Sequence, residues 1–153
     1  PGGTYEWHIM GNAWGDGDGP NLIWDQIDIG RPETLFITAT EESPFSIRII
    51  SLNASGQAGV IGGFVAGELY SAMIISSYSV EPADAFNTAK FSLDVSQFQT
   101  NLGTGPAAGS FSLTLDGSNL MLNFTAVPEP STYALMLVGL GFVGWTVWRR
   151  RHY

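Results

Sequence analysis

Apolar and polar residues alternate in short runs along most of this chain, and before residue 127 no long run repeats with the 3.6-residue period of a helix. The clearest alternation places apolar residues at positions 111, 113 and 115, and again at 120, 122 and 124. The turn residues Asp116-Gly117-Ser118-Asn119 separate these runs, and glycine and asparagine tolerate the positive φ of a tight turn. Because successive side chains of a strand point to opposite faces, residues 110–127 are predicted to form a β-hairpin.

Seven other short runs have the composition of strands, and several are broken by Gly, Pro, Asn or Ser. They cover residues 4–10, 21–29, 34–40, 45–52, 59–66, 68–80 and 89–98. Short strands with frequent turn residues predict one mainly β domain at residues 1–126, folded as an antiparallel β-sandwich or jelly roll. A short parallel β-helix is the competing architecture, and the lack of a fixed-period repeat counts against it.

Charge is divided unevenly between the two ends of the chain. Residues 1–126 hold thirteen acidic and three basic residues, a net charge of −10, whereas residues 127–153 carry +2. An acidic body without a basic stripe is repelled by phosphate backbones, so nucleic acid is not an expected partner. The chain has no cysteine, which excludes a disulfide framework and thiolate metal sites.

The carboxyl-terminal segment has the pattern of a membrane span. Residues 131–148 are eighteen consecutive positions without a formal charge. As a helix this run rises roughly 27 Å, close to the ~30 Å hydrocarbon core of a bilayer. Aromatic residues near the ends of the run and a basic stop after it are typical of membrane interfaces. These flanking residues are Tyr133, Trp145, Trp148, Arg149, Arg150 and Arg151. We therefore expect a transmembrane helix at 131–148 and a cytoplasmic stop at 149–153.

Two prolines mark the boundary between the body and this span. Pro128 and Pro130 are disfavoured inside a helix and favour extended backbone, so residues 127–130 are expected to form a linker. Because arginine-rich flanks stay in the cytoplasm, the body is expected on the periplasmic side of the inner membrane. A helix buried in the protein's own core is the alternative. A run that is apolar on all sides and ends in three arginines favours the lipid bilayer instead.

The order of these parts resembles a known sorting signal. The stretch Val127-Pro128-Glu129-Pro130-Ser131, an apolar span with three glycines, and a final arginine cluster resemble the PEP-CTERM signal of exported proteins in Gram-negative bacteria. The resemblance covers residues 127–153 and does not extend to the body. It implies that Pro128, Glu129 and Pro130 form a recognition element, near which a membrane-embedded exosortase processes the protein. It also implies association with the cell surface or with an exopolysaccharide matrix.

Two kinds of function fit this organisation. The first is a non-catalytic exported protein, tethered to the lipid bilayer and delivered to the cell surface or matrix. The alternative is a single-span accessory subunit of a larger membrane complex, with its β-domain in the periplasm. A third and weaker hypothesis is a calcium-dependent carbohydrate-binding module.

That third hypothesis depends on residues near the amino-terminal end. In GNAWGDGDGPN, Asp16 and Asp18 are spaced so that their oxygens could bind calcium on a tight glycine loop. The loop does not match an EF-hand, and a solvated turn is the simpler interpretation. Trp7, Trp14 and Trp24 could stack on the rings of an extracellular polysaccharide if they were exposed, although aromatic residues more often fill a core.

Residue types for catalysis are sparse. His8 is the only histidine of residues 1–126, so a zinc site is disfavoured and a Ser-His-Asp triad would have to use it. No Gly-x-Ser-x-Gly turn and no phosphate-binding glycine loop with Lys-Ser/Thr occurs. We therefore do not expect an enzyme, and we expect no cofactor other than the calcium considered above.

Overall fold

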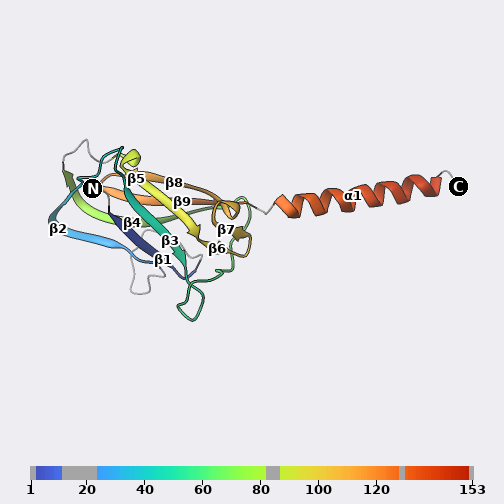
Figure 1. The fold of residues 1–153 in the computed structure, drawn as a ribbon, viewed down its shortest axis with the longest axis horizontal. Helices are drawn as coiled ribbons and strands as arrows, with labels where there is room; N and C mark the ends of the chain where they lie inside the picture. The colour runs from blue at the N-terminus through green and yellow to red at the C-terminus, as the bar shows by residue number, and fades with distance from the viewer. Residues whose placement is uncertain (1–2, 12–23, 82–86, 128–129, 152–153) are drawn as a thin grey trace.

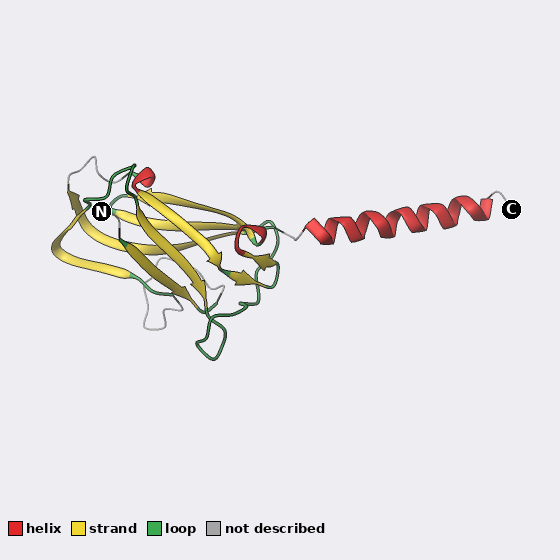
Figure 2. Ribbon diagram, in the orientation of Figure 1, coloured by secondary structure: helices red, strands yellow, loops and turns green. Residues whose placement is uncertain are grey.

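The computed structural model describes residues 3–11, 24–81, 87–127 and 130–151, and it shows a mainly β body followed by one helix (Figures 1 and 2). The strands are β1 (Thr4–Ile9), β2 (Ile27–Phe36), β3 (Phe45–Ser51), β4 (Leu69–Glu81), β5 (Phe91–Gln97), β6 (Gln99–Thr100), β7 (Gly103–Thr104), β8 (Gly109–Asp116) and β9 (Asn119–Ala126). The helices are two short 3-10 turns, η1 (Thr88–Lys90) and η2 (Gly105–Ala107), and α1 (Pro130–Arg151). The prediction of a mainly β body is confirmed.

Two main sheets enclose a single core. The first has the strand order β1-β3-β5 and the second β2-β4-β9-β8, while β6 and β7 form a small third sheet. The chain changes sheet after each of its first four strands, so β1, β3 and β5 gather in the first sheet and β2 and β4 in the second. The two layers are visible in Figure 1, where β8 and β9 run along the long axis of the body and β1, β3 and β5 cross them obliquely.

The predicted antiparallel sandwich or jelly roll is wrong for the first five strands. β1 with β3, β3 with β5, and β2 with β4 are parallel pairs, whereas β4–β9, β8–β9 and β6–β7 are antiparallel. The reason lies in the connections. Parallel neighbours need a crossover, and here the crossover between two neighbours is a strand of the other sheet. These five strands therefore follow the winding of the β-helix alternative, although no sequence repeat accompanies it.

The predicted carboxyl-terminal hairpin is confirmed. β8 and β9 pair in continuous antiparallel register from Gly109 opposite Ala126 to Asp116 opposite Asn119. Gly117, in the connecting turn, has a φ of 59°, a backbone conformation that glycine adopts without steric cost. Along β9 the side chains alternate between buried and half-buried positions, as a strand that covers a core on one face requires.

Aromatic rings fill the core at the end of the body nearest α1. The ring of Phe124 on β9 lies 5.0 Å from that of Phe98, 4.7 Å from that of Phe111 and 5.3 Å from that of Phe64. Phe98 and Phe124 are fully buried. Such edge-to-face and offset pairs add stabilisation to the burial of their apolar area. The loops that carry Phe64 and Phe98 are thereby held against β8 and β9.

A row of charged side chains crosses the parallel sheet. Glu6 on β1 and Asp94 on β5 lie in register on either side of Arg48 on β3. Arg48 Nη1 lies 3.1 Å from Glu6 Oε1, and Arg48 Nε donates to Asp94 Oδ2 at 2.9 Å. Hydrogen bonds from Ser96 and from Arg48 hold the pKa of Asp94 at about 2, below its usual value. Each of the three parallel strands thus contributes one charge to this row.

Candidate functional site

The predicted sorting residues lie where the β body ends and α1 begins. The backbone N–H of Val127 donates to a carbonyl of the body, that of Ala108, at 3.0 Å. Pro128 and Glu129 follow directly and lie outside the described residues. Pro130 is the first residue of α1, a position that suits proline because a helix leaves its first N–H groups unpaired. The helix therefore begins one residue before the predicted start.

α1 carries exposed apolar side chains along its length. Ten of its described large apolar side chains are exposed, and Leu135, at 74%, is the most exposed of them. Figure 1 shows the helix extending away from the sheets on one side of the body. The alternative of a helix buried in the protein's own core is therefore wrong. The helix also continues to Arg151, so the arginines form its last turn and do not follow it as a separate segment.

The aromatic and basic residues predicted at the membrane interfaces all fall on α1. The guanidinium carbon of Arg149 lies 5.6 Å from the centre of the Trp145 ring, one helical turn earlier, which is a cation–π contact. Trp148 is 61% exposed. The side chains of Tyr133, Arg150 and Arg151 lie outside the described set. Of the residues predicted at the membrane interface, Arg149 and Trp145 are thus in contact with each other.

In the part of the chain that the structure describes, no helix is both long enough and apolar enough to cross a membrane. The predicted transmembrane helix at residues 131–148 is not confirmed.

Two of the three early tryptophans, Trp7 and Trp24, are buried and cannot contribute to a sugar-binding surface. Trp7 is fully buried and Trp24 is 9% exposed, and both belong to the core. The Trp24 indole donates to the carbonyl of Met73 at 3.1 Å. The proposed stacking of these two rings on a polysaccharide is wrong, because their faces pack against the protein itself. Trp14 and the predicted calcium residues Asp16 and Asp18 lie outside the described residues.

His8 is paired with a residue that sequence reasoning missed. Its Nδ1 lies 2.7 Å from Asp25 Oδ2, and its backbone N–H donates to the same oxygen at 3.0 Å. In return the Asp25 N–H donates to the His8 carbonyl at 2.9 Å. Burial, and then the nearby Asp25 charge, raise the pKa of Tyr5. The pair therefore joins both ends of the segment between β1 and β2.

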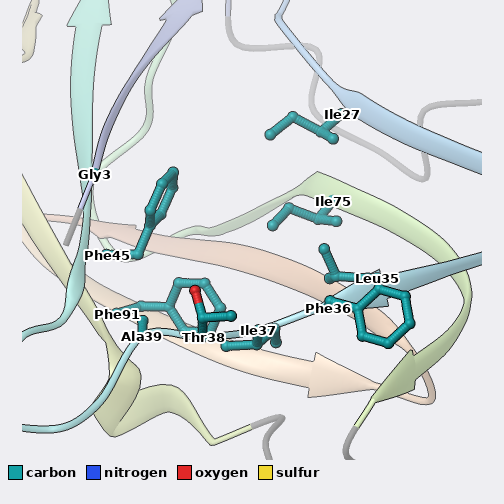
Figure 3. A pocket seen from close by; sticks show the side chains of 10 residues that line it. All are labelled: Gly3, Ile27, Leu35, Phe36, Ile37, Thr38, Ala39, Phe45, Ile75 and Phe91. Carbon is teal, nitrogen blue, oxygen red and sulfur yellow. The ribbon is translucent and has the colours of Figure 1, made fainter. Parts of the chain in front are cut away.

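An apolar pocket opens between the two sheets at the end of the body opposite α1. Its volume is about 220 Å³. Figure 3 shows Phe45 and Phe91 on one side, with Ile27, Leu35 and Ile75 on the other. The two phenylalanine rings meet edge to face at 6.4 Å. No local sequence pattern marks this pocket, because only the fold brings together the strand ends that line it.

Comparison with known proteins identifies the tail. Residues 126–151 match the family model for the PEP-CTERM protein-sorting motif. The match includes the Pro-Glu-Pro residues, all of α1 and the arginines, and it confirms the resemblance seen in the sequence. No curated protein and no solved structure matches the chain.

Proposed function

We propose that this chain is an exported, non-catalytic β-domain whose tail inserts into the inner membrane and presents Pro128-Glu129-Pro130 to an exosortase-type enzyme. The sorting motif indicates an exported protein that such an enzyme processes. Membrane insertion, a periplasmic body and delivery to the cell surface or matrix are the further steps of the proposal. The observation that carries it is the exposed apolar helix that begins directly after the motif residues.

The geometry at the junction supports access by an enzyme. Among the described residues, Val127 makes the last hydrogen bond of the body, and α1 begins at Pro130, so Pro128 and Glu129 lie between the two in sequence. Proline disfavours helical backbone in the residue before it, which is consistent with a helix that begins at Pro130. A membrane-embedded enzyme could then reach this segment without unfolding β9.

The side chains of α1 fit a membrane environment better than water. Its apolar residues are exposed on a helix whose described side chains include one charge, that of Arg149. Transferring such side chains from water into hydrocarbon is favourable by about 25 cal/mol for each Å² removed from water. The arginine can extend toward lipid headgroups while its stem stays apolar. This arrangement would hold the arginines in the cytoplasm and the body in the periplasm.

Processing is tested by intact mass spectrometry of the full-length protein produced in a Gram-negative host, with and without its exosortase. We expect the exosortase to remove the mass that follows approximately Pro130. Glu129→Ala should abolish this loss, whereas the matched control Ser131→Ala, which keeps the Pro-Glu-Pro step, should be processed normally. A wild-type protein that keeps its entire tail in the exosortase-positive host would contradict the proposal.

One observation favours the alternative of a single-span subunit. Gly139 and Gly141 have open space where a Cβ would lie, so another helix could approach α1 closely there. In that case the tail would be retained, and the protein would co-purify with other membrane chains in mild detergent. The mass measurement therefore separates the two functions.

A further inference from the structure

A second, polar groove lies on the second sheet and is independent of the tail. Its volume is about 340 Å³, within the ~300–1,000 Å³ range of small-molecule sites. We call it the serine groove; its lining residues are Asp28, Ile29, Gly30, Ser76, Ser77, Tyr78 and Ser118. Ser76 and Tyr78 alternate along β4 with the buried Ile75 and Ser77, so they face away from the core.

A bulge in β2 opens the groove. Ile29 pairs with Ser77 and Thr34 with Ser79. Between these two pairs β2 advances by five residues, whereas β4 advances by two. The extra residues carry β2 away from β4 at this point. The other side is closed by the tip of the β8–β9 hairpin, where Ser118 Oγ donates to the Ser77 carbonyl at 2.5 Å. The floor of the groove is therefore fixed before any ligand arrives.

The groove contains two polar side chains, Asp28 and Ser76, that the described part of the fold does not use. Asp28 and Ser76 lie opposite each other in register on neighbouring strands, and Asp28 is exposed. In the part of the chain that the structure describes, neither side chain has a hydrogen-bond partner. Tyr78 is 53% exposed and lies two residues beyond Ser76, roughly 7 Å along the same face of the strand. A carboxylate, a hydroxyl and an aromatic ring thus line one groove.

We propose that the serine groove binds a neutral, hydroxyl-rich ligand of the saccharide class. Asp28 can accept hydrogen bonds from ligand hydroxyls, and the Ser76 hydroxyl can both donate and accept them. The Tyr78 ring offers an apolar face for the C–H side of a sugar ring. None of the described lining residues is cationic, and the body carries a net charge of −10, which disfavours an anionic ligand.

The proposal is tested by titrating the full-length protein, held in mild detergent, with D-glucose, D-galactose, D-mannose and N-acetyl-D-glucosamine. Binding is followed by amide shifts in ¹H–¹⁵N NMR spectra. We expect at least one sugar to shift the amides of residues 28–30, 76–78 and 118 in a saturable way. Asp28→Asn and Tyr78→Ala should each weaken that binding by roughly tenfold. The control Phe36→Ala removes an exposed aromatic ring outside the groove and should leave binding unchanged.

Two other results would overturn the proposal. One is the absence of saturable shifts with all four sugars while the protein remains folded, as judged from its dispersed amide spectrum. The other is binding of a cationic probe, tetramethylammonium, in place of the sugars, because a carboxylate beside an aromatic ring also suits a cation. Variants are compared only where their melting temperature stays close to that of the wild type. This test does not involve the sorting motif, so its failure leaves the proposed sorting function intact.

Discussion

At the scale of single residues, the charged row of Glu6, Arg48 and Asp94 depends on the parallel pairing of β1, β3 and β5. Each charge sits on a different strand, and the row forms only if these three positions share one register. The side chains are 35–51% exposed, so solvent screens their attraction and the energetic contribution is small. The row therefore indicates the register of the three strands, and the lowered pKa of Asp94 allows the row to be tested in solution.

The lowered pKa of Asp94 predicts how stability depends on pH. Ser96 Oγ donates to Asp94 Oδ1 at 2.7 Å, and with the Arg48 bond this holds the pKa near 2 against an ordinary value of 3.8. A carboxylate with a lowered folded-state pKa stabilises the protein above its unfolded-state value, and that stabilisation is lost as pH falls from about 4 to about 2. The melting temperature should therefore fall less across this interval in Asp94→Asn than in the wild type.

Glu33→Gln is the control for this measurement, because Glu33 is an exposed carboxylate on β2, outside the charge row. It should show the wild-type loss of stability between pH 4 and pH 2. An Asp94→Asn curve that follows the wild type through the same interval would mean that Asp94 is not held by Ser96 and Arg48 in solution.

At the scale of elements, Gly109 fixes where β8 begins. A Cβ added to it would collide with the carbonyl oxygen of Thr125 and with the Phe124 ring. Gly109→Ala should therefore force β8 away from β9 and lower the free energy of unfolding by about 1–3 kcal/mol, as overpacking of a core does. Gly30→Ala is the matched control, since a Cβ there meets nothing within 4 Å, and it should change stability by less than about 0.5 kcal/mol. Urea unfolding measures both, and equal stability of the two variants would contradict this packing.

The alternation of apolar residues predicted most of the strands but not their directions. The run predicted as a strand at 59–66 is wrong, since it contains only an isolated bridge at Ile61. The hairpin of β8 and β9 was predictable because its turn residues are adjacent in sequence and determine an antiparallel pair. The alternating pattern of β1, β3 and β5 is the same whether the neighbour is parallel or antiparallel, so it held no information on direction. The runs at 21–29 and 34–40 were expected as separate strands, yet parts of both join in β2 across its bulge.

At the scale of the whole molecule, the sequence supported the tail motif better than any site on the body. The motif is contiguous in sequence, from Pro128 through Glu129 to Pro130, so it can be recognised without knowledge of the fold. The serine groove and the apolar pocket combine residues from strands far apart in sequence, and no local pattern marks them. The burial of Trp7 and Trp24 could not be predicted from the sequence either, because composition does not say which face of a strand meets the core.

The separation of α1 from the body leads to a last prediction. No strand or 3-10 helix of the described body shares an extensive contact with α1. A chain that stops after Val127 should therefore melt within a few degrees of the full chain and remain monomeric without detergent. The full chain should self-associate in water and become monomeric in detergent, because its exposed apolar side chains gain by leaving water. Size-exclusion chromatography with light scattering measures both states.

A full-length variant with Leu135, Leu137 and Leu140 all changed to Ser separates the effect of apolar surface from that of chain length. These leucines are 74%, 67% and 62% exposed, so their replacement removes apolar area without opening a cavity. The variant should self-associate less than the wild type while its β body melts at the same temperature. If the wild-type chain were monomeric in water and the truncated chain unfolded, α1 would have to pack on the sheets, and the tail could not serve as a free segment for membrane sorting.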